Sequence, residues 1–86
     1  MALDSGAVTV AATATEISFD TQGGMSILVQ NLSGVDVYLG DSGVATTTGF
    51  KLTDGSSISY SLLTGDKLYG IVATGTADVR VQWIGL

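Results

Sequence analysis

The chain of 86 residues contains no histidine, no cysteine and no proline. Without histidine, a Ser-His-Asp triad, a Cys-His dyad and a histidine-ligated zinc site are excluded. Without cysteine, disulfides, thiolate metal sites and thiol nucleophiles are excluded as well. The sequence therefore offers little apparatus for proton transfer, and we expect a protein that is not an enzyme and that uses no metal ion or other cofactor.

Positive charge is also scarce. The three basic residues are Lys51, Lys67 and Arg80, and against eight acidic residues they leave a formal net charge of −5. A nucleic-acid-binding protein needs a basic footprint, and an acidic membrane surface attracts basic segments, so neither partner is expected. Residues 1–6 have neither the basic nor the apolar part of a signal peptide, and no apolar run approaches the roughly 18 residues of a membrane helix. We therefore expect synthesis and folding in the cytoplasm.

Small and hydroxyl-bearing residues take the place of the missing charge. Hydrophobic residues make up 45% of the chain and charged residues only 13%, whereas about 25% is usual. The sequence instead contains 12 glycines, 11 threonines and 9 serines. At this length the chain is expected to form one domain with a thin hydrophobic core and a neutral surface rich in hydroxyl groups.

The hydrophobic pattern predicts an all-β fold. Short apolar or alternating segments recur about every ten residues and are separated by Gly, Asp, Asn and Ser, and no segment has a helical period. The expected strands are residues 7–11, 15–19, 25–31, 35–40, 50–52, 57–62, 67–73 and 77–84. We predict a small antiparallel β-sandwich or jelly roll of about eight strands, with a small closed β-barrel as the alternative.

Two finer predictions concern the most apolar of these segments. Residues 25–31 contain Ile27, Leu28 and Val29 in succession, which favours a central strand buried on both faces. The turn signal at residues 31–34 then predicts a β-hairpin that joins this strand to residues 35–40. Because the strands contain no proline and little charge, we also expect copies of the chain or a partner to cover the sheet edges.

Residues 40–43 read Gly-Asp-Ser-Gly, as around the nucleophile of serine proteases. Such a serine needs a base, and no histidine is available, so the segment is interpreted as a turn that Asp41 caps, with Gly40 and Gly43 at positive φ. Asp54 and Asp66 also lie beside glycines. Asx turns are favoured there over a calcium site, because the calcium-loop pattern is absent.

The aromatic residues Tyr38, Tyr60, Tyr69 and Trp83 are candidates for a sugar-binding platform. Tyr60 and Trp83 lie on the apolar face of their segments, which predicts a place in the core. Tyr38 lies opposite Val37 in the alternation and is the aromatic residue expected to be exposed. Core or subunit contacts are therefore favoured over a lectin site.

A resemblance to a known group of proteins extends over residues 29–81. The phrases that carry it are Val-Gln-Asn-Leu-Ser-Gly at 29–34, Val-Tyr-Leu-Gly-Asp-Ser-Gly-Val at 37–44, Thr-Gly-Phe-Lys-Leu at 48–52, Asp-Gly-Ser at 54–56, Leu-Tyr-Gly-Ile at 68–71 and Gly-Thr-Ala-Asp-Val-Arg-Val at 75–81. In style and order this region resembles the small β-sandwich proteins encoded among the structural genes of tailed bacteriophages. Residues 1–21 match nothing in that group.

The resemblance implies a component of the virion, assembled in the host-cell cytoplasm. It implies foremost a capsid decoration protein that binds the outside of the shell as a homo-oligomer, with a trimer favoured, and stabilises it. Its partners would be further copies of itself and the major capsid protein, with no nucleic acid and no membrane. The alternative is a head-fibre or tail accessory domain that binds a host receptor or carbohydrate.

Two regions are expected to make these protein contacts. The first is residues 1–10, and the second is residues 41–48, within the longest irregular stretch of the chain. Residues 1–21 are either an arm that grips the capsid, with residues 1–6 extended, or simply the first two strands. The predicted contact residues are Met1, Ala2, Leu3, Asp4, Tyr38, Asp41, Val44, Thr46, Thr47 and Thr48.

Overall fold

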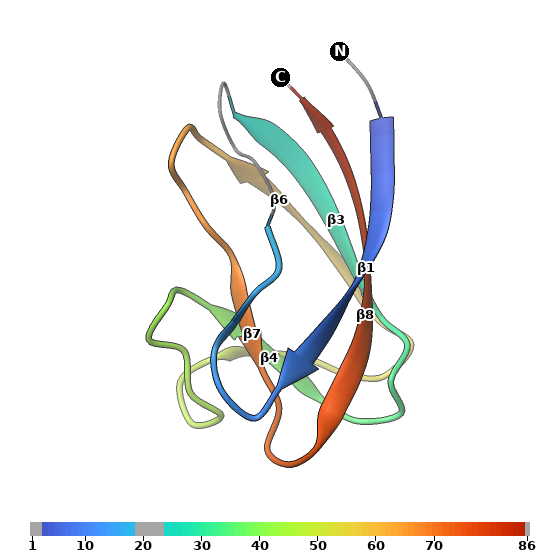
Figure 1. Ribbon diagram of the computed structural model, residues 1–86, viewed down its shortest axis with the longest axis vertical. Helices are drawn as coiled ribbons and strands as arrows, with labels where there is room; N and C mark the ends of the chain where they lie inside the picture. Colours follow the sequence, from blue (N-terminus) through green and yellow to red (C-terminus); the bar gives the residue numbers. More distant parts are fainter. Residues whose placement is uncertain (1–2, 19–23, 86) are drawn as a thin grey trace.

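A computed structural model of the protein describes residues 3–18 and 24–85. Two four-stranded antiparallel sheets pack face to face, and the described ends of the chain lie together at one end of the molecule (Figure 1). The strands are β1 (Leu3–Ala11), β2 (Thr15–Glu16), β3 (Met25–Asn31), β4 (Val37–Gly40), β5 (Phe50–Leu52), β6 (Ser57–Leu62), β7 (Tyr69–Ile71) and β8 (Thr76–Gly85). No described segment is a helix that could span a membrane.

The strand order is that of a jelly roll. One sheet has the order β1-β8-β3-β6 and the other has the order β2-β7-β4-β5, so the all-β sandwich prediction is confirmed. The two sheets keep separate edges over the described residues, which rules out the closed-barrel alternative. The predicted bounds of β3, β5 and β6 agree with the observed strands.

The predicted hairpin between residues 25–31 and 35–40 is wrong. β3 pairs with β6 and β8, whereas β4 pairs with β5 and β7 in the other sheet. The chain therefore crosses between the two layers over residues 32–36. A strand with alternating side chains buries one face against the core whichever sheet it belongs to. The alternation of residues 35–40 therefore could not show whether they pair with residues 25–31 or cross to the other sheet.

Burial on both faces of β3 is also wrong, although the strand does lie inside its sheet. Its side chains alternate between buried and outward, and Leu28 is 41% exposed. The inner side chains of both sheets form one core. Tyr60 and Trp83 pack against this core as predicted, but both are only partly buried. The other sheet packs on only one face of β3. In the apolar run of Ile27, Leu28 and Val29, the middle residue therefore faces the solvent.

Ile17 and Ser18 continue beyond β2 as an irregular extension. Their backbone N–H groups both donate to the carbonyl oxygen of Leu68, at 2.7 and 3.2 Å, and the Ser18 hydroxyl accepts from the Leu68 N–H at 3.0 Å. The expected strand at residues 15–19 is therefore shorter than predicted, and Phe19 lies outside the described residues.

Tyr60 gives the stability of the fold a dependence on alkaline pH. Burial disfavours the phenolate and raises the pKa of Tyr60 above its usual value of 10.0. A raised pKa in the folded state contributes stability that is present below the unfolded pKa and is lost as the pH rises through the folded pKa. We expect urea unfolding of the wild type to show falling stability above about pH 10, and Tyr60→Phe to show a smaller fall. Parallel curves for the two proteins would contradict this prediction.

Candidate interaction surface

The outer face of the β1-β8-β3-β6 sheet is a surface of unusual composition that extends over four strands. Side chains alternate across each strand, and the register aligns one set of residues on this outer face. This set consists of Leu3, Ser5, Ala7, Thr9 and Ala11 from β1, Thr76, Asp78, Arg80, Gln82 and Ile84 from β8, Ser26, Leu28 and Gln30 from β3, and Ser57, Ser59 and Ser61 from β6. The face is therefore built mainly from hydroxyl groups, amides and small side chains.

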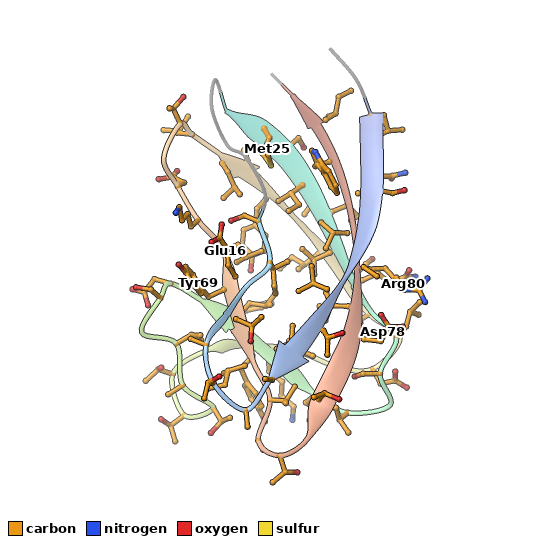
Figure 2. All side chains as sticks on the ribbon, viewed as in Figure 1. Glu16, Met25, Tyr69, Asp78 and Arg80 are labelled. Atoms are coloured by element: carbon orange, nitrogen blue, oxygen red, sulfur yellow. The ribbon has the colours of Figure 1, made fainter. Side chains whose placement is uncertain are left out.

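Its two charged residues neutralise each other. The Arg80 guanidinium donates from Nε to Oδ1 of Asp78 at 3.1 Å and from Nη2 to Oδ2 at 3.0 Å. This hydrogen bonding lowers the pKa of the Asp78 carboxyl and raises the pKa of Arg80. Both side chains lie on the right of Figure 2, on the far side of the molecule from Glu16 and Tyr69. The pair leaves the face with no net charge.

A shallow groove of about 580 Å³ runs across this face. Two leucines stand in it among polar groups, Leu28 with 41% of its surface exposed and Leu32 with 46%. The other side chains that line it are Ser5, Ala7, Gln30, Ser57, Arg80 and Gln82. The amides offer both donors and acceptors without charge, so the groove suits a neutral partner surface that carries an apolar projection.

The predicted N-terminal contact residues belong in part to this sheet. Leu3 is 60% exposed and pairs with Ile84, and residues 3–6 are paired with β8 as the beginning of β1. Asp4 stands opposite Trp83 in this register. Met1 and Ala2 lie outside the described residues.

The predicted contact loop at residues 41–48 lies elsewhere, in the green to yellow segment at the lower left of Figure 1, whereas β1 begins at the top right. Asp41 caps it as expected: its Oδ1 accepts from the Gly43 N–H at 2.9 Å, and its carbonyl accepts from the Val44 N–H at 3.0 Å. Thr46, Thr47 and Thr48 are exposed, as is Asp41. The side chain of Val44 is only 7% exposed, so it anchors the loop and contributes little to its outer surface.

The prediction of positive φ at Gly40 and Gly43 is wrong, because neither is among the glycines with such a backbone. At Gly40 the requirement is space instead. A Cβ atom there would lie 3.0 Å from Cγ2 of Val44, so the absent side chain lets the loop fold back onto β4. At Gly43 the nearest atom to a Cβ would be Oδ1 of Asp41 at an ordinary 3.5 Å.

Tyr38 is half-buried on the outer face of the other sheet. It stands across from Ile71 on β7 and from Lys51 on β5. The Lys51 ammonium lies 3.3 Å from the carboxylate of Asp36. Among the described aromatic residues, Phe50 is more exposed, at 57% of its surface. The expectation of Tyr38 as the exposed aromatic therefore applies better to Phe50, whose place at the edge of the sheet no alternation pattern reveals.

Asn31 has a structural role that was not predicted from the sequence. It is fully buried, and its Nδ2 donates to the carbonyl oxygens of Val35 at 2.7 Å and Leu52 at 2.9 Å. Its Oδ1 accepts from the N–H of Ser33 at 3.0 Å and from the Ser33 hydroxyl at 2.6 Å. One side chain thus ties the end of β3 to the crossing segment and to β5. The sequence showed only an asparagine in a turn.

Of the other two loop aspartates, Asp66 follows the expectation more closely. Its Oδ2 accepts from the N–H of Leu63 within the same turn, at 3.0 Å. Asp54 instead accepts from the N–H of Gly34, 20 residues away, at 2.9 Å, and so joins two loops. Among the described residues, no group of three or more acidic side chains is arranged to hold a metal ion.

No family model matches the chain, and no curated protein matches it.

Proposed function

We propose that this protein is a non-enzymatic structural component of a phage virion, a capsid decoration protein that binds the outside of the shell as a homo-oligomer and stabilises it. The observation that carries the proposal is the neutral outer face of the β1-β8-β3-β6 sheet, with its groove and the two exposed leucines that line the groove. The resemblance of residues 29–81 to small virion proteins supplies the biological setting.

The composition of this face favours protein contact for an energetic reason. Serine, alanine and threonine side chains lose little conformational entropy when a partner covers them, whereas lysine and glutamate lose much more. The Asp78–Arg80 pair is already satisfied on the face itself, so a partner need not supply a counter-charge. A surface of this kind binds through shape, amide hydrogen bonds and burial of the leucines.

Stabilisation of a shell follows from repetition. A single small interface of this type has modest affinity, because association first has to offset the loss of rotational and translational freedom. When copies contact one another as well as the shell, each further contact forms at a high effective concentration. Many modest contacts then hold neighbouring shell subunits together.

The groove can be tested with a matched pair of leucine variants. Leu28→Ser removes an exposed side chain from the groove, and Leu63→Ser removes one that is 71% exposed in a turn elsewhere. We expect Leu28→Ser to weaken binding to expanded empty shells about tenfold, by loss of apolar burial. Leu63→Ser should bind as the wild type does. The measurement is co-sedimentation with the shells, expressed as copies bound per shell.

Wild-type protein should saturate the shells at a fixed number of copies and should raise their resistance to heat. Absence of wild-type binding would overturn the proposal and would favour a receptor-binding fibre or tail domain. Equal binding by the two variants would remove the groove from the contact surface.

A further inference from the structure

The free edge of β1 carries a row of backbone groups turned away from its own sheet. At the end of the strand, the Ala11 N–H donates to Oγ1 of Thr15 at 3.1 Å, and the Ala11 carbonyl accepts from the Val72 N–H at 3.1 Å. Ala11 therefore bonds away from β8. In an antiparallel ladder this orientation alternates along the strand, so Leu3, Ser5, Ala7 and Thr9 also point their N–H and C=O groups outward.

A bond on the other side of β8 supports this assignment. The carbonyl of Asp78 accepts from the N–H of Leu32, which follows β3, at 3.1 Å. Asp78 thus bonds toward β3 and away from β1, and its partner in the register is Thr9. Thr9 consequently turns its backbone groups to the open side. β1 is an edge strand of its sheet, and in the upper half of Figure 1 it is the outermost strand on the right.

The other sheet protects its edges where this sheet does not. Its edge strands are β2, of two residues, and β5, of three, and Glu16 and Lys51 place charge on them. β1 has nine residues with Asp4 as its one charge, and β6 has six residues with no charge. Long edge strands with little charge and no proline are templates for pairing with a further strand.

We infer that β1 pairs antiparallel with β1 of a second copy of this chain, across a two-fold axis at Gly6. This inference names the contact within the homo-oligomer of the proposed function, on which it rests for its biological setting but not for its test. It departs from a simple trimer, because a two-fold contact joins subunits in pairs.

The register follows from the open groups. With Gly6 opposite Gly6 of the second copy, Leu3 pairs with Thr9 and Ser5 with Ala7, so all four open residues of each strand form hydrogen-bonded pairs. Asp4 then stands opposite Val8, and the two Asp4 residues are kept apart. Glycine at the axis leaves the closest approach free of side chains. With Ala7 at the axis instead, Leu3 would meet Ala11, whose backbone groups are already bonded to Thr15 and Val72. With Ser5 at the axis, Thr9 would have no partner among the described residues.

β6 is the competing edge of the same sheet. Asn31 exchanges backbone bonds with the residues just before β6: its N–H donates to Ser56 and its carbonyl accepts from Gly55. By the same alternation Ser57, Ser59 and Ser61 turn outward. This edge offers three open residues against four on β1, and it has no glycine at its centre.

Two proline variants distinguish the edges. Ala7→Pro and Ser59→Pro each remove one outward N–H without removing a bond of the strand to its own sheet, which an edge strand tolerates. Analytical ultracentrifugation of the purified protein, without shells, should show a weak dimer for the wild type. We expect Ala7→Pro to weaken that dimer at least tenfold and Ser59→Pro to leave it unchanged. A wild type that stays monomeric at about millimolar concentration, or a larger effect of Ser59→Pro, would overturn the inference.

Cysteine variants test the register, and they suit this chain because it has no cysteine of its own. Gly6→Cys should form a disulfide-linked dimer on oxidation, because the two Cα atoms of a non-hydrogen-bonded pair are about 4.5 Å apart. Thr9→Cys should not, because its two copies would be offset by about 20 Å along the strands. Cross-linking of Thr9→Cys in preference to Gly6→Cys would overturn the register. Loss of shell binding with an intact dimer would contradict only the proposed function.

Discussion

Asn31→Asp is expected to destabilise the fold by at least about 3 kcal/mol. The substitution keeps the shape of the side chain but replaces the Nδ2 donor with a carboxylate oxygen. That oxygen would face the carbonyl oxygens of Val35 and Leu52, which the amide now contacts at 2.7 and 2.9 Å. The buried carbonyl of Leu52 and the partly buried carbonyl of Val35 would lose the amide donor, and a charge would be buried without a counter-charge. For a domain of this size, such a loss is a large share of the total stability.

The pH dependence of this variant separates the electrostatic cause from a general loss of packing. Burial raises the pKa of an introduced carboxyl above its unfolded value of about 3.9. The variant should therefore regain stability relative to wild type as the pH falls toward that value, since the protonated acid can donate again. Urea unfolding at pH 7 and pH 4 measures both differences.

Ser33→Ala is the matched control for Asn31→Asp. It removes the hydroxyl that donates to Oδ1 of Asn31 at 2.6 Å, but Ser33 is partly exposed and leaves no charge behind. We expect a loss of about 1 kcal/mol that does not change between the two pH values. A loss below about 1 kcal/mol for Asn31→Asp would show that Asn31 does not hold the crossing segment in place.

Gly49→Ala is the second large effect, and it acts on the loop at residues 41–48. A Cβ atom at Gly49 would lie 2.7 Å from Cβ of Tyr38, 2.8 Å from Cγ2 of Val44 and 3.1 Å from the carbonyl oxygen of Ala45. None of these atoms is the end of a long flexible side chain, so the backbone of the loop has to move. We expect a loss of about 1–3 kcal/mol in the free energy of unfolding, as for other overpacked sites.

Gly43→Ala provides the control within the same loop. Its backbone φ is not positive, and the nearest neighbour of an added Cβ is at an ordinary contact distance. A change within about 0.5 kcal/mol is expected in urea unfolding. Chemical shifts of Tyr38 and Val44 should move in Gly49→Ala and stay in place in Gly43→Ala. Equal stability of the two variants would mean that the loop does not pack on β4 as described.

The same pair of variants bears on the predicted contacts of Thr46, Thr47 and Thr48. If these threonines bind the shell, Gly49→Ala should weaken shell binding at temperatures where the variant is still folded. The structure places them on the opposite side of the molecule from the start of β1, so the two predicted contact regions do not form one patch. Their part in binding stays a prediction.

Much of the fold was accessible from local sequence. Residues 57–62 alternate serine with Ile58, Tyr60 and Leu62, and this pattern needs only one buried face and one wet face, which any sandwich provides. The absence of histidine and cysteine, which excludes the chemistry that needs these side chains, likewise follows from the composition alone. These features depend on residue type and on neighbours within a few positions.

Other features depend on which strands meet across the sheets. Whether residues 25–31 and 37–40 share a sheet, and why Leu28 faces outward, are decided by pairing between segments far apart in the chain. The groove combines residues of four strands, and Asn31 reaches the carbonyl of Leu52, 21 positions away. Sequence alone therefore determined the all-β class, the positions of most strands and the absence of histidine and cysteine chemistry. Only the tertiary structure decided the neighbours, because hydrogen bonding and packing between strands depend on distance in space.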